Sequence, residues 1–320
     1  MDRADDLAWY QATFGAVVDN VARVIRGKQD VVGLAVLCLV AEGHVLIEDV
    51  PGVGKTLLAK SIARSIDCTF QRIQFTPDLL PSDVTGVSVF DRQTSSFIFR
   101  PGAVFANIVV GDEINRASPK TQAALLEAME ERQVTIDGMT HPLLPPFMVV
   151  ATQNPLEHEG TYPLPEAQLD RFMARLVVGY PDRATTIDIL NTHGERSTFD
   201  TLSPVIHGND VLRLGEIARS VHVADAVRDY LADVIEATRS HPEMLLGASP
   251  RSGLHLLRLA RARAAASGRD YLSPDDIKAV SLPVLGHRMI LRPEAHMRGV
   301  TLGDVVSNIL GRIPVPGSLR

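Results

Sequence analysis

The residues with the clearest chemical potential lie near the start of the chain, in the sequence EDVPGVGKTLL at positions 48–58. The β-branched and apolar residues 45–47 before it are typical of a buried strand, and apolar residues recur at helical spacing after it. A glycine-rich turn between a strand and a helix that closes on Gly54-Lys55-Thr56 predicts a phosphate-binding loop. Glycines let backbone N–H groups turn toward a phosphate, and the N-terminus of the following helix adds positive potential.

The roles expected within this loop follow from residue type. Lys55 suits the terminal phosphates of a nucleotide, and the Thr56 hydroxyl suits Mg²⁺. Asp49 stands where the usual pattern has its first glycine, but Gly52 and Gly54, which must allow the closest approach, are present. An ordinary glycine turn is the alternative, and it leaves a lysine unexplained in a chain where arginine far outnumbers lysine. The candidate nucleotide-binding residues here are Pro51, Gly52, Val53, Gly54, Lys55, Thr56 and Leu57.

Two carboxylates follow another apolar strand, residues 108–111, the third strand expected in the chain. Ligands bind at the carboxyl ends of parallel strands, so Asp112 and Glu113 are expected to face the phosphate loop. Asp112 is the candidate residue for Mg²⁺, held through water, and Glu113 is the candidate base that orients and deprotonates the attacking water. Two acids at a strand end are commonly only solvated, so this assignment depends on the phosphate loop beside them.

Three further polar residues have a weaker signal from spacing alone. Asn154 follows the strand 147–151, where its amide suits a hydrogen bond to the γ-phosphate or to the attacking water, although such a residue is more often part of a turn. Arg171, in EAQLDRF, and Arg251, in SPRSG at a helix start, carry a charge that suits phosphate. An isolated arginine is usually a solvated surface charge, and spacing does not lift these two above that interpretation.

The elements that position these residues alternate between strands and helices up to about residue 181, which predicts an α/β fold with a parallel sheet covered on both faces. Two hairpins are expected within it, at 87–100 and at 134–140, the second with an Asp-Gly turn. Amphipathic helices follow without a strand-like run, and a capping pattern at 273–276 opens the last of them. We therefore expect an α/β nucleotide-binding core over 1–195 and an all-α domain over 196–320.

Composition excludes several classes of function. The chain has 320 residues and a net charge of −6 without a block of like charges, which argues against nucleic-acid binding. Cys38 and Cys68 lack metal-ligand spacing, so we expect them to be buried apolar residues of a protein in a reducing compartment. The histidines are scattered, so we expect no metal site besides the one for Mg²⁺. The acidic N-terminus is not a signal peptide, and the longest apolar run, 31–41, is too short for a membrane span. We expect a cytoplasmic protein without an integral membrane segment.

Five stretches of the sequence together resemble the MoxR family of AAA+ ATPases. They are EDVPGVGKTLLAK, DLLPSDVTG, RPGAVFANIVVGDEINRASPKTQAALLEAMEE, VATQNP and PLPEAQLDRF. They cover most of residues 21–180 in the family's order, and SPRSGLHLLRLARA extends the resemblance more weakly into the helical remainder. The resemblance implies a P-loop core that hydrolyses ATP, a C-terminal helical lid, and assembly into a ring that is commonly a homo-hexamer.

The resemblance also implies roles for single residues and for the two hairpins. In chain order it places Gly27 at the adenine, Lys55 and Thr56 in Walker A, Asp112 and Glu113 in Walker B, Asn154 as sensor 1, Arg171 as the arginine finger and Arg251 as sensor 2. Arg116 is the rival finger, and the role of Lys120 stays open. The hairpins correspond to the helix-2 insert and the pre-sensor-1 insert of this clade.

The function expected from these observations is an ATP- and Mg²⁺-dependent motor or switch that remodels a protein partner. Members of the resembled family are thought to act as chaperones, often for proteins with a von Willebrand factor A domain. The ATPase subunit of a magnesium-chelatase-like complex is the alternative within the clade, and the integrin-type or proline/acidic extension that would favour it is not in this sequence. The hypothesis of a nucleic-acid motor would need a basic stripe formed by the arginines at 258, 261 and 263. These arginines are more simply explained as solvated surface charges. An intact set of candidate catalytic residues argues against a pseudoenzyme. The sequence names neither the client nor the number of subunits, nor does it distinguish threading from switching.

Overall fold

A five-stranded parallel sheet forms the centre of the α/β half of the protein, in the order β2-β5-β8-β1-β9. The computed structural model describes residues 3–155, 160–192 and 198–316. The strands are β1 (Val45–Glu48), β2 (Phe70–Gln74), β5 (Ile108–Asp112), β8 (Met148–Gln153) and β9 (Ala174–Leu176). Parallel pairing between all neighbours confirms the α/β fold expected from the alternation of strands and helices.

Helices cover both faces of this sheet. Successive residues of β1 enter different apolar clusters, since Val45 and Ile47 belong to one and Leu46 to the other. This arrangement explains why β1 and β5 are apolar up to their last residue rather than alternating. The helical elements of this half are α1 (Arg3–Ala22), α2 (Gln29–Val40), α3 (Lys55–Ser65), α4 (Pro81–Thr85), the 3₁₀ turn η1 (Ile114–Arg116), α5 (Pro119–Glu131), α6 (Glu166–Leu169) and α7 (Arg183–Thr192).

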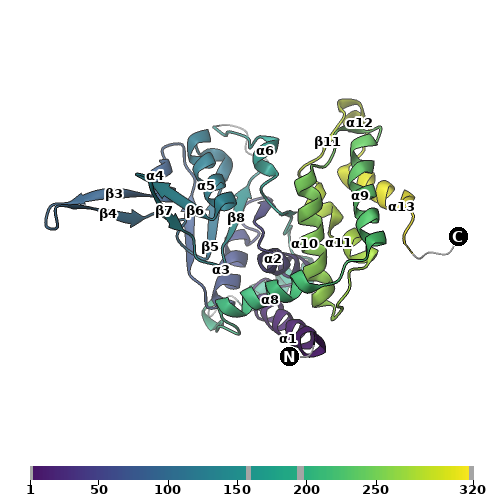
Figure 1. Cartoon of the computed structure of the whole chain (residues 1–320), viewed down its shortest axis with the longest axis horizontal. Helices are drawn as coiled ribbons and strands as arrows, with labels where there is room; N and C mark the ends of the chain where they lie inside the picture. Colours follow the sequence, from purple (N-terminus) through teal and green to yellow (C-terminus); the bar gives the residue numbers. More distant parts are fainter. Residues whose placement is uncertain (1–2, 156–159, 193–197, 317–320) are drawn as a thin grey trace.

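Both expected hairpins are present. β3 (Gly86–Asp91) pairs with β4 (Ser96–Pro101) and projects far from the body of the protein, as Figure 1 shows. β6 (Gln133–Ile136) pairs with β7 (Met139–Pro142) across a two-residue turn. Asp137 and Gly138 in that turn have φ of 50° and 78°, the left-handed conformation that a tight hairpin turn requires.

The C-terminal part is mainly helical, as expected of a lid, with two differences from the expectation. Its elements are the 3₁₀ turn η2 (Thr198–Thr201), α8 (Gly208–Ser220), α9 (Asp225–Ser240), β10 (Met244–Leu246), α10 (Pro250–Ala266), α11 (Pro274–Leu285), β11 (Ile290–Leu291), α12 (Pro293–Met297) and α13 (Leu302–Arg312). The antiparallel pair β10–β11 and the two helices after α11 correct the expectation of a strand-free region that ends with one helix. Strands of three and two residues are too short to show a period of two. The expected domain boundary at 195/196 lies outside the described residues.

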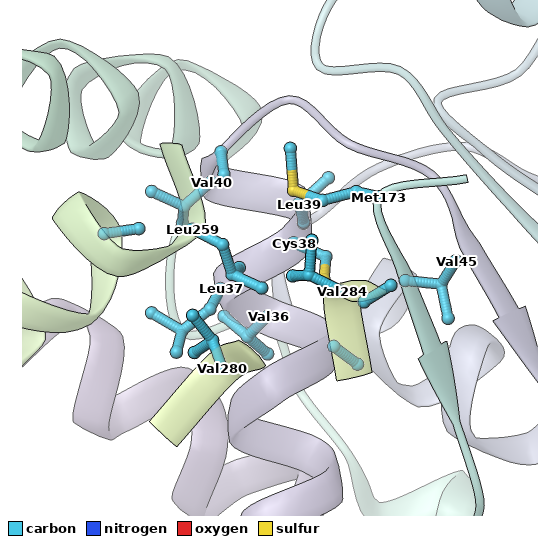
Figure 2. Packing of buried hydrophobic residues seen from close by; sticks show 14 of the residues in the cluster. Val36, Leu37, Cys38, Leu39, Val40, Val45, Met173, Leu259, Val280 and Val284 are labelled. Carbon is cyan, nitrogen blue, oxygen red and sulfur yellow. The ribbon is translucent and has the colours of Figure 1, made fainter. Parts of the chain in front are cut away.

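Helix α2 joins the two halves of the molecule. Figure 2 shows its residues Val36 to Val40 packed among Val45 and Met173 of the α/β half and Leu259, Val280 and Val284 of helices α10 and α11. Burial of a side chain of this size stabilises the folded state by about 1.5–3 kcal/mol, so the second half of α2, residues 35–40, which is buried on all sides, has reason to be apolar all round. Because α2 leads into β1, the lid helices α10 and α11 meet the sheet near the amino-terminal ends of its strands.

Candidate functional site

The loop between β1 and α3 has the backbone expected of a phosphate-binding loop. Gly52 and Gly54 have φ of 84° and 93°, in the left-handed region that glycine adopts without strain. A Cβ placed on Gly52 would meet no atom within 4 Å, so the loop is open above this residue. Gly54 is the N-cap of α3, which places the positive end of the helix dipole at the loop. An anionic phosphate fits this backbone.

Asp49, the departure from the usual glycine pattern, anchors the loop. Its buried carboxylate accepts hydrogen bonds from the backbone N–H of Val50 at 2.8 Å and of Gly179 at 2.6 Å. The second contact ties the loop to the segment that follows β9. The Lys55 ammonium donates to the carbonyl oxygens of Asp49 at 2.6 Å and Gln153 at 3.3 Å, between the ends of β1 and β8.

Strand pairing brings Asp112 to this loop. The Thr56 hydroxyl donates to the Asp112 carboxylate at 3.0 Å, and the Thr152 hydroxyl of β8 donates to its other oxygen at 3.2 Å. Asp112 is buried at the end of β5. Carboxylate and hydroxyl oxygens are hard ligands of the kind that Mg²⁺ prefers, so Thr56 and Asp112 fit this metal.

Glu113 takes a conformation that is uncommon for its residue type. Its φ of 58° lies in the left-handed region and turns the chain sharply at the end of β5. The Glu113 backbone N–H donates to the Thr152 hydroxyl at 3.0 Å, and its carboxylate accepts from Gln74 and Arg116, each at 3.0 Å. The rival finger Arg116 therefore lies on the carboxyl-terminal edge, paired with an acid of its own chain.

The sequence did not indicate two of the residues at this edge, Arg72 and Gln74 of β2. Arg72 Nε donates to the Asp112 carboxylate at 2.6 Å, and Gln74 reaches Glu113 as described above. The spacing of two residues puts both side chains on one face of the strand. The signal that was missing is the pairing of β2 with β5, in which Gln74 is aligned with Asp112.

Two further candidates lie near the same edge. Asn154 is buried and follows β8, the strand between β5 and β1. Gly27 has φ of 68° and lines a hollow of about 570 Å³ with Arg26, Val31 and Thr185 among its other walls. A Cβ on Gly27 would come within 2.8 Å of the Thr185 hydroxyl, so the close packing here requires glycine. Ile25, two residues earlier, lies 3.8 Å from the Cβ position of Gly54, which places this segment beside the phosphate loop.

The two candidate arginines lie elsewhere. Arg171 Nε pairs with one carboxylate oxygen of Glu130 at 2.9 Å, and Arg251 pairs with the other oxygen. These residues line a polar hollow of about 340 Å³ together with residues 42–44, which come directly before β1. Since the phosphate loop comes directly after β1, Arg171 and Arg251 lie at the opposite, amino-terminal edge of the parallel sheet.

The positive charge at this amino-terminal edge comes from arginines and not from histidines. Burial lowers the pKa of His44 to about 4. Burial, together with the nearby Arg288, Arg258 and Arg251, lowers the pKa of His255 to about 3. Both histidines are therefore neutral near pH 7, where the arginines keep their charge.

Among the helices in residues 3–155, 160–192 and 198–316, none has the length and apolar character needed to cross a bilayer.

Comparisons with known proteins match both halves of the chain. A family model described as "ATPase family associated with various cellular activities (AAA)" matches residues 44–174, and one described as "AAA lid domain" matches residues 236–309. The chain is 49% identical over 302 residues to the uncharacterized protein YeaC of Bacillus subtilis, with 94% of each chain covered. It is 42% identical over 323 residues to the chaperone MoxR1 of Mycobacterium tuberculosis, with 98% of this chain and 85% of the relative covered.

Similarity of structure agrees with similarity of sequence. A provisionally assigned ATPase from Cytophaga hutchinsonii superposes with a TM-score of 0.91 at 37% identity, with 97% of each chain covered. The parallel sheet, the phosphate loop beside Asp112 and the helical lid are the parts that such an ATPase needs. Together with the 42% identity to MoxR1 over nearly the whole chain, they show that this chain belongs to the MoxR family of AAA+ ATPases and is an enzyme that hydrolyses ATP.

Proposed function

We propose that this ATPase hydrolyses Mg²⁺-ATP at sites shared between the subunits of a homo-hexameric ring, and that the cycle remodels protein partners. The observation that carries the proposal is the separation of the candidate groups within one subunit. Lys55, Thr56 and Asp112 lie at the carboxyl-terminal edge of the sheet, whereas Arg171 and Arg251 lie at the amino-terminal edge. Arginines in that position suit the nucleotide of a second copy rather than that of their own chain.

The carboxyl-terminal edge holds the nucleotide in this proposal. Backbone N–H groups of the loop around Gly52 and Gly54 bind phosphate oxygens, and Lys55 exchanges its carbonyl partners for phosphate. Thr56 and Asp112 hold Mg²⁺, which neutralises charge on the phosphate oxygens when it is bound. The segment at Gly27 lines the adenine.

Glu113 acts as the general base, since it is the carboxylate beside Asp112 and the phosphate loop. It orients the attacking water and accepts its proton. Gln74 and Arg116 hold the Glu113 carboxylate in place through the contacts described above. Asn154, at the end of the strand between β5 and β1, donates a hydrogen bond to the γ-phosphate or to this water.

Arg171 of a neighbouring subunit completes the site as the arginine finger. The phosphoryl-transfer transition state spreads negative charge over oxygens, and a further cation stabilises it. Arg251, which belongs to the lid, approaches the same phosphate from α10. Contacts from two subunits and from the lid then tie the state of the nucleotide to the angle between subunits.

The hairpin β3–β4 is the proposed contact for protein clients. It projects from the body (Figure 1) and exposes large apolar side chains, among them Phe90 at 50% and Phe97 at 68%. Exposed apolar groups gathered on one projection favour an interaction surface over a solvated turn. The relative MoxR1 is named a chaperone, and a von Willebrand factor A domain protein is the client that the family resemblance favours. A cytoplasmic location and the domain boundary at 195/196 stay predictions from the sequence.

The shared site is tested by the concentration dependence of hydrolysis. ATPase activity per subunit should rise steeply with protein concentration and reach a plateau where mass photometry detects rings. Constant activity per subunit at concentrations where only monomers are present would contradict the proposal.

Client binding is tested separately with a trapped ATP state. Glu113→Gln loaded with ATP should retain a von Willebrand factor A domain protein, and Lys55→Ala should not. Replacing Phe90 and Phe97 by serine should remove this retention without changing basal hydrolysis. Equal retention by the serine variant would exclude the hairpin as the contact.

A further inference from the structure

The residue before Arg171 is held by the lid. The Asp170 carboxylate accepts hydrogen bonds from the Ser249 hydroxyl at 3.0 and 3.1 Å and pairs with Arg288 Nε at 2.9 Å. Ser249 is the N-cap of α10, and Arg288 follows α11. Asp170 itself lies between α6 and β9, on the α/β half of the protein. The core segment that carries Arg171 is therefore fastened to two elements of the lid.

Arg288 also fastens the main chain on both sides of Arg171. Its guanidinium donates to the carbonyl oxygens of Asp170 at 3.1 Å, of Phe172, and of Met173 at 3.4 Å. It is anchored within the lid by a hydrogen bond to the Val284 carbonyl oxygen at 2.6 Å. Figure 2 shows Met173 and Val284 in the apolar cluster that surrounds α2, so this junction is buried. A main chain held on both sides leaves Arg171 little freedom.

The guanidinium remains a cation in this buried position. The Arg288 side chain is 2% exposed, and burial lowers its pKa to about 10 while Asp170 opposes that shift. A buried cation needs partners, and Asp170 supplies the opposite charge. The ion pair between them is consequently a required contact of the fold, unlike most exposed ion pairs.

The contacts continue from Arg288 to the second arginine of the edge. His255 accepts a hydrogen bond from Arg288 through Nδ1, in keeping with its neutral state. His255 lies one turn after Arg251 on α10, and Arg251 meets Arg171 at Glu130. A closed circuit of contacts thus runs from Arg171 through the lid and back to Arg171.

We propose that Asp170, Ser249 and Arg288 form a latch through which the lid positions the arginine finger. The inference rests on the proposed role of Arg171 across the subunit interface. Asp170 and Arg288 are positioning residues, because they fix the backbone around Arg171 and lie apart from the phosphate loop. Because this contact is fixed, a shift of the lid carries the Arg171 segment with it and moves the finger relative to the neighbouring site. Loss of the latch therefore lowers kcat and leaves ATP affinity unchanged.

The variant Asp170→Asn keeps the shape of the side chain and removes its charge. It should bind ATP with the wild-type Kd and hydrolyse it about 10²-fold more slowly, the effect of a misplacement of about 1 Å. Mixing experiments give a readout that a loss of stability would not produce. Asp170→Asn should regain activity with Glu113→Gln, which supplies an intact finger, and should stay inactive with Arg171→Ala, which supplies none.

Asp276→Asn is the matched control. Asp276 is a buried lid carboxylate held by two arginines, Arg263 and Arg269, and by the Ser273 hydroxyl. Its loss should lower the melting temperature without the selective rescue by Glu113→Gln. The same selective rescue for Asp276→Asn would overturn the latch, because any weakening of the lid would then suffice.

The double variant Asp170→Asn/Arg288→Met guards against a simple failure to fold. It removes both charges, so no buried cation is left without its partner. It should fold, and it should still show the lowered kcat and the selective rescue by Glu113→Gln that are expected when the finger is misplaced. Wild-type kcat in this double variant would overturn the latch. Rescue of Arg171→Ala by Glu113→Gln without rescue of Asp170→Asn would overturn the latch alone. Failure of both mixtures would contradict the finger across the interface, and the latch with it.

Discussion

At the carboxyl-terminal edge of the sheet, the reactive groups come from a short loop and from strand ends that backbone pairing aligns. At the amino-terminal edge, Arg171 and Arg251 are brought together by packing of the lid against the core, and they share the carboxylate of Glu130. The first edge is built on one loop and on the pairing of neighbouring strands within the α/β half. The second also depends on packing of the lid against the core, through the pairs Ser249–Asp170 and Arg251–Glu130, which are 79 and 121 positions apart in the chain.

This difference separates two tasks. The carboxyl-terminal edge can bind a nucleotide in a single subunit. Thr56 already contacts Asp112, and Lys55 already contacts the carbonyl oxygens at the ends of β1 and β8. In the proposed ring, the amino-terminal edge serves hydrolysis when a second subunit presents it. Loss of the Lys55 contact should therefore alter affinity, whereas loss of an arginine at the amino-terminal edge, like loss of the base Glu113, should alter turnover.

Removal of the finger should give the largest effect. Arg171→Ala should lower kcat by about 10³-fold or more, because a cation at the transition state is lost, and should leave the Kd for ATP nearly unchanged. Steady-state hydrolysis and calorimetric binding measure the two quantities. Arg228→Ala, an exposed arginine paired with Asp225 on α9, is the control and should have wild-type kcat. A Kd for ATP that rises as strongly as kcat falls would contradict the claim that Arg171 acts on turnover and not on ATP affinity.

Removal of the base should follow closely in size. Glu113→Gln keeps the shape of the side chain and removes the proton acceptor, so hydrolysis should fall by about 10²–10⁴-fold while ATP binding survives. The exposed Glu127 on α5, replaced by Gln, provides the control. Undiminished turnover in the Glu113 variant would remove this residue from the mechanism.

Loss of the Lys55 contact to phosphate should give a smaller effect, on ATP affinity rather than on turnover. Lys55→Ala should raise the Kd for ATP by about 10- to 100-fold, the loss expected for a charge-assisted hydrogen bond. Lys60→Ala, on the same helix with its ammonium over the Phe199 ring, should bind ATP normally. A normal Kd for Lys55→Ala in a calorimeter would show that the loop is not the phosphate site.

The smallest predicted effect is a loss of stability at acidic pH that arises at the amino-terminal edge. His44 and His255, at the amino-terminal edge, have folded pKa values of about 4 and about 3, below the unfolded value. The folded state therefore binds fewer protons than the unfolded state below about pH 6.5, and stability is lost as pH falls from there toward the folded values. Between pH 7.5 and 5.5 each histidine should cost about 1 kcal/mol of unfolding free energy.

Urea unfolding at these two pH values measures this loss. In His255→Gln the loss should be smaller than in the wild type by about the contribution of one histidine. An equal loss in both proteins would exclude His255 as a source of acid sensitivity.

The sequence predicted the carboxyl-terminal edge better than the other edge for a physical reason. A strand, a glycine loop and a helix are neighbours in the chain, and parallel strands bring Asp112 and Asn154 to the edge where the loop lies. The face of β2 that carries Arg72 was not predictable, because it depends on pairing with β5. The Asp-Gly turn of the second hairpin was predictable because its conformation is local.

The placement of the arginines illustrates what local patterns do not contain. Arg171 and Arg251 each looked like a solvated charge, and the family resemblance alone gave them roles. Their common partner Glu130 lies on α5, and the buried Arg288 that fixes the neighbouring Asp170 follows α11. Such contacts arise only when α11 packs against β9 and the start of α10 meets Asp170 and Glu130, which no periodicity within one segment specifies.

Complementation between two inactive variants tests the central claim most directly. A Glu113→Gln subunit keeps its finger, and an Arg171→Ala subunit keeps its base, so mixed rings contain interfaces that pair an intact base with an intact finger. Hydrolysis should return in the mixture to a substantial fraction of the wild-type rate and should depend on the ratio of the two variants. Native mass spectrometry confirms that the subunits exchange. If they exchange and the mixture stays inactive, Arg171 does not act across the interface, and Arg116→Ala should then be mixed with Glu113→Gln in its place.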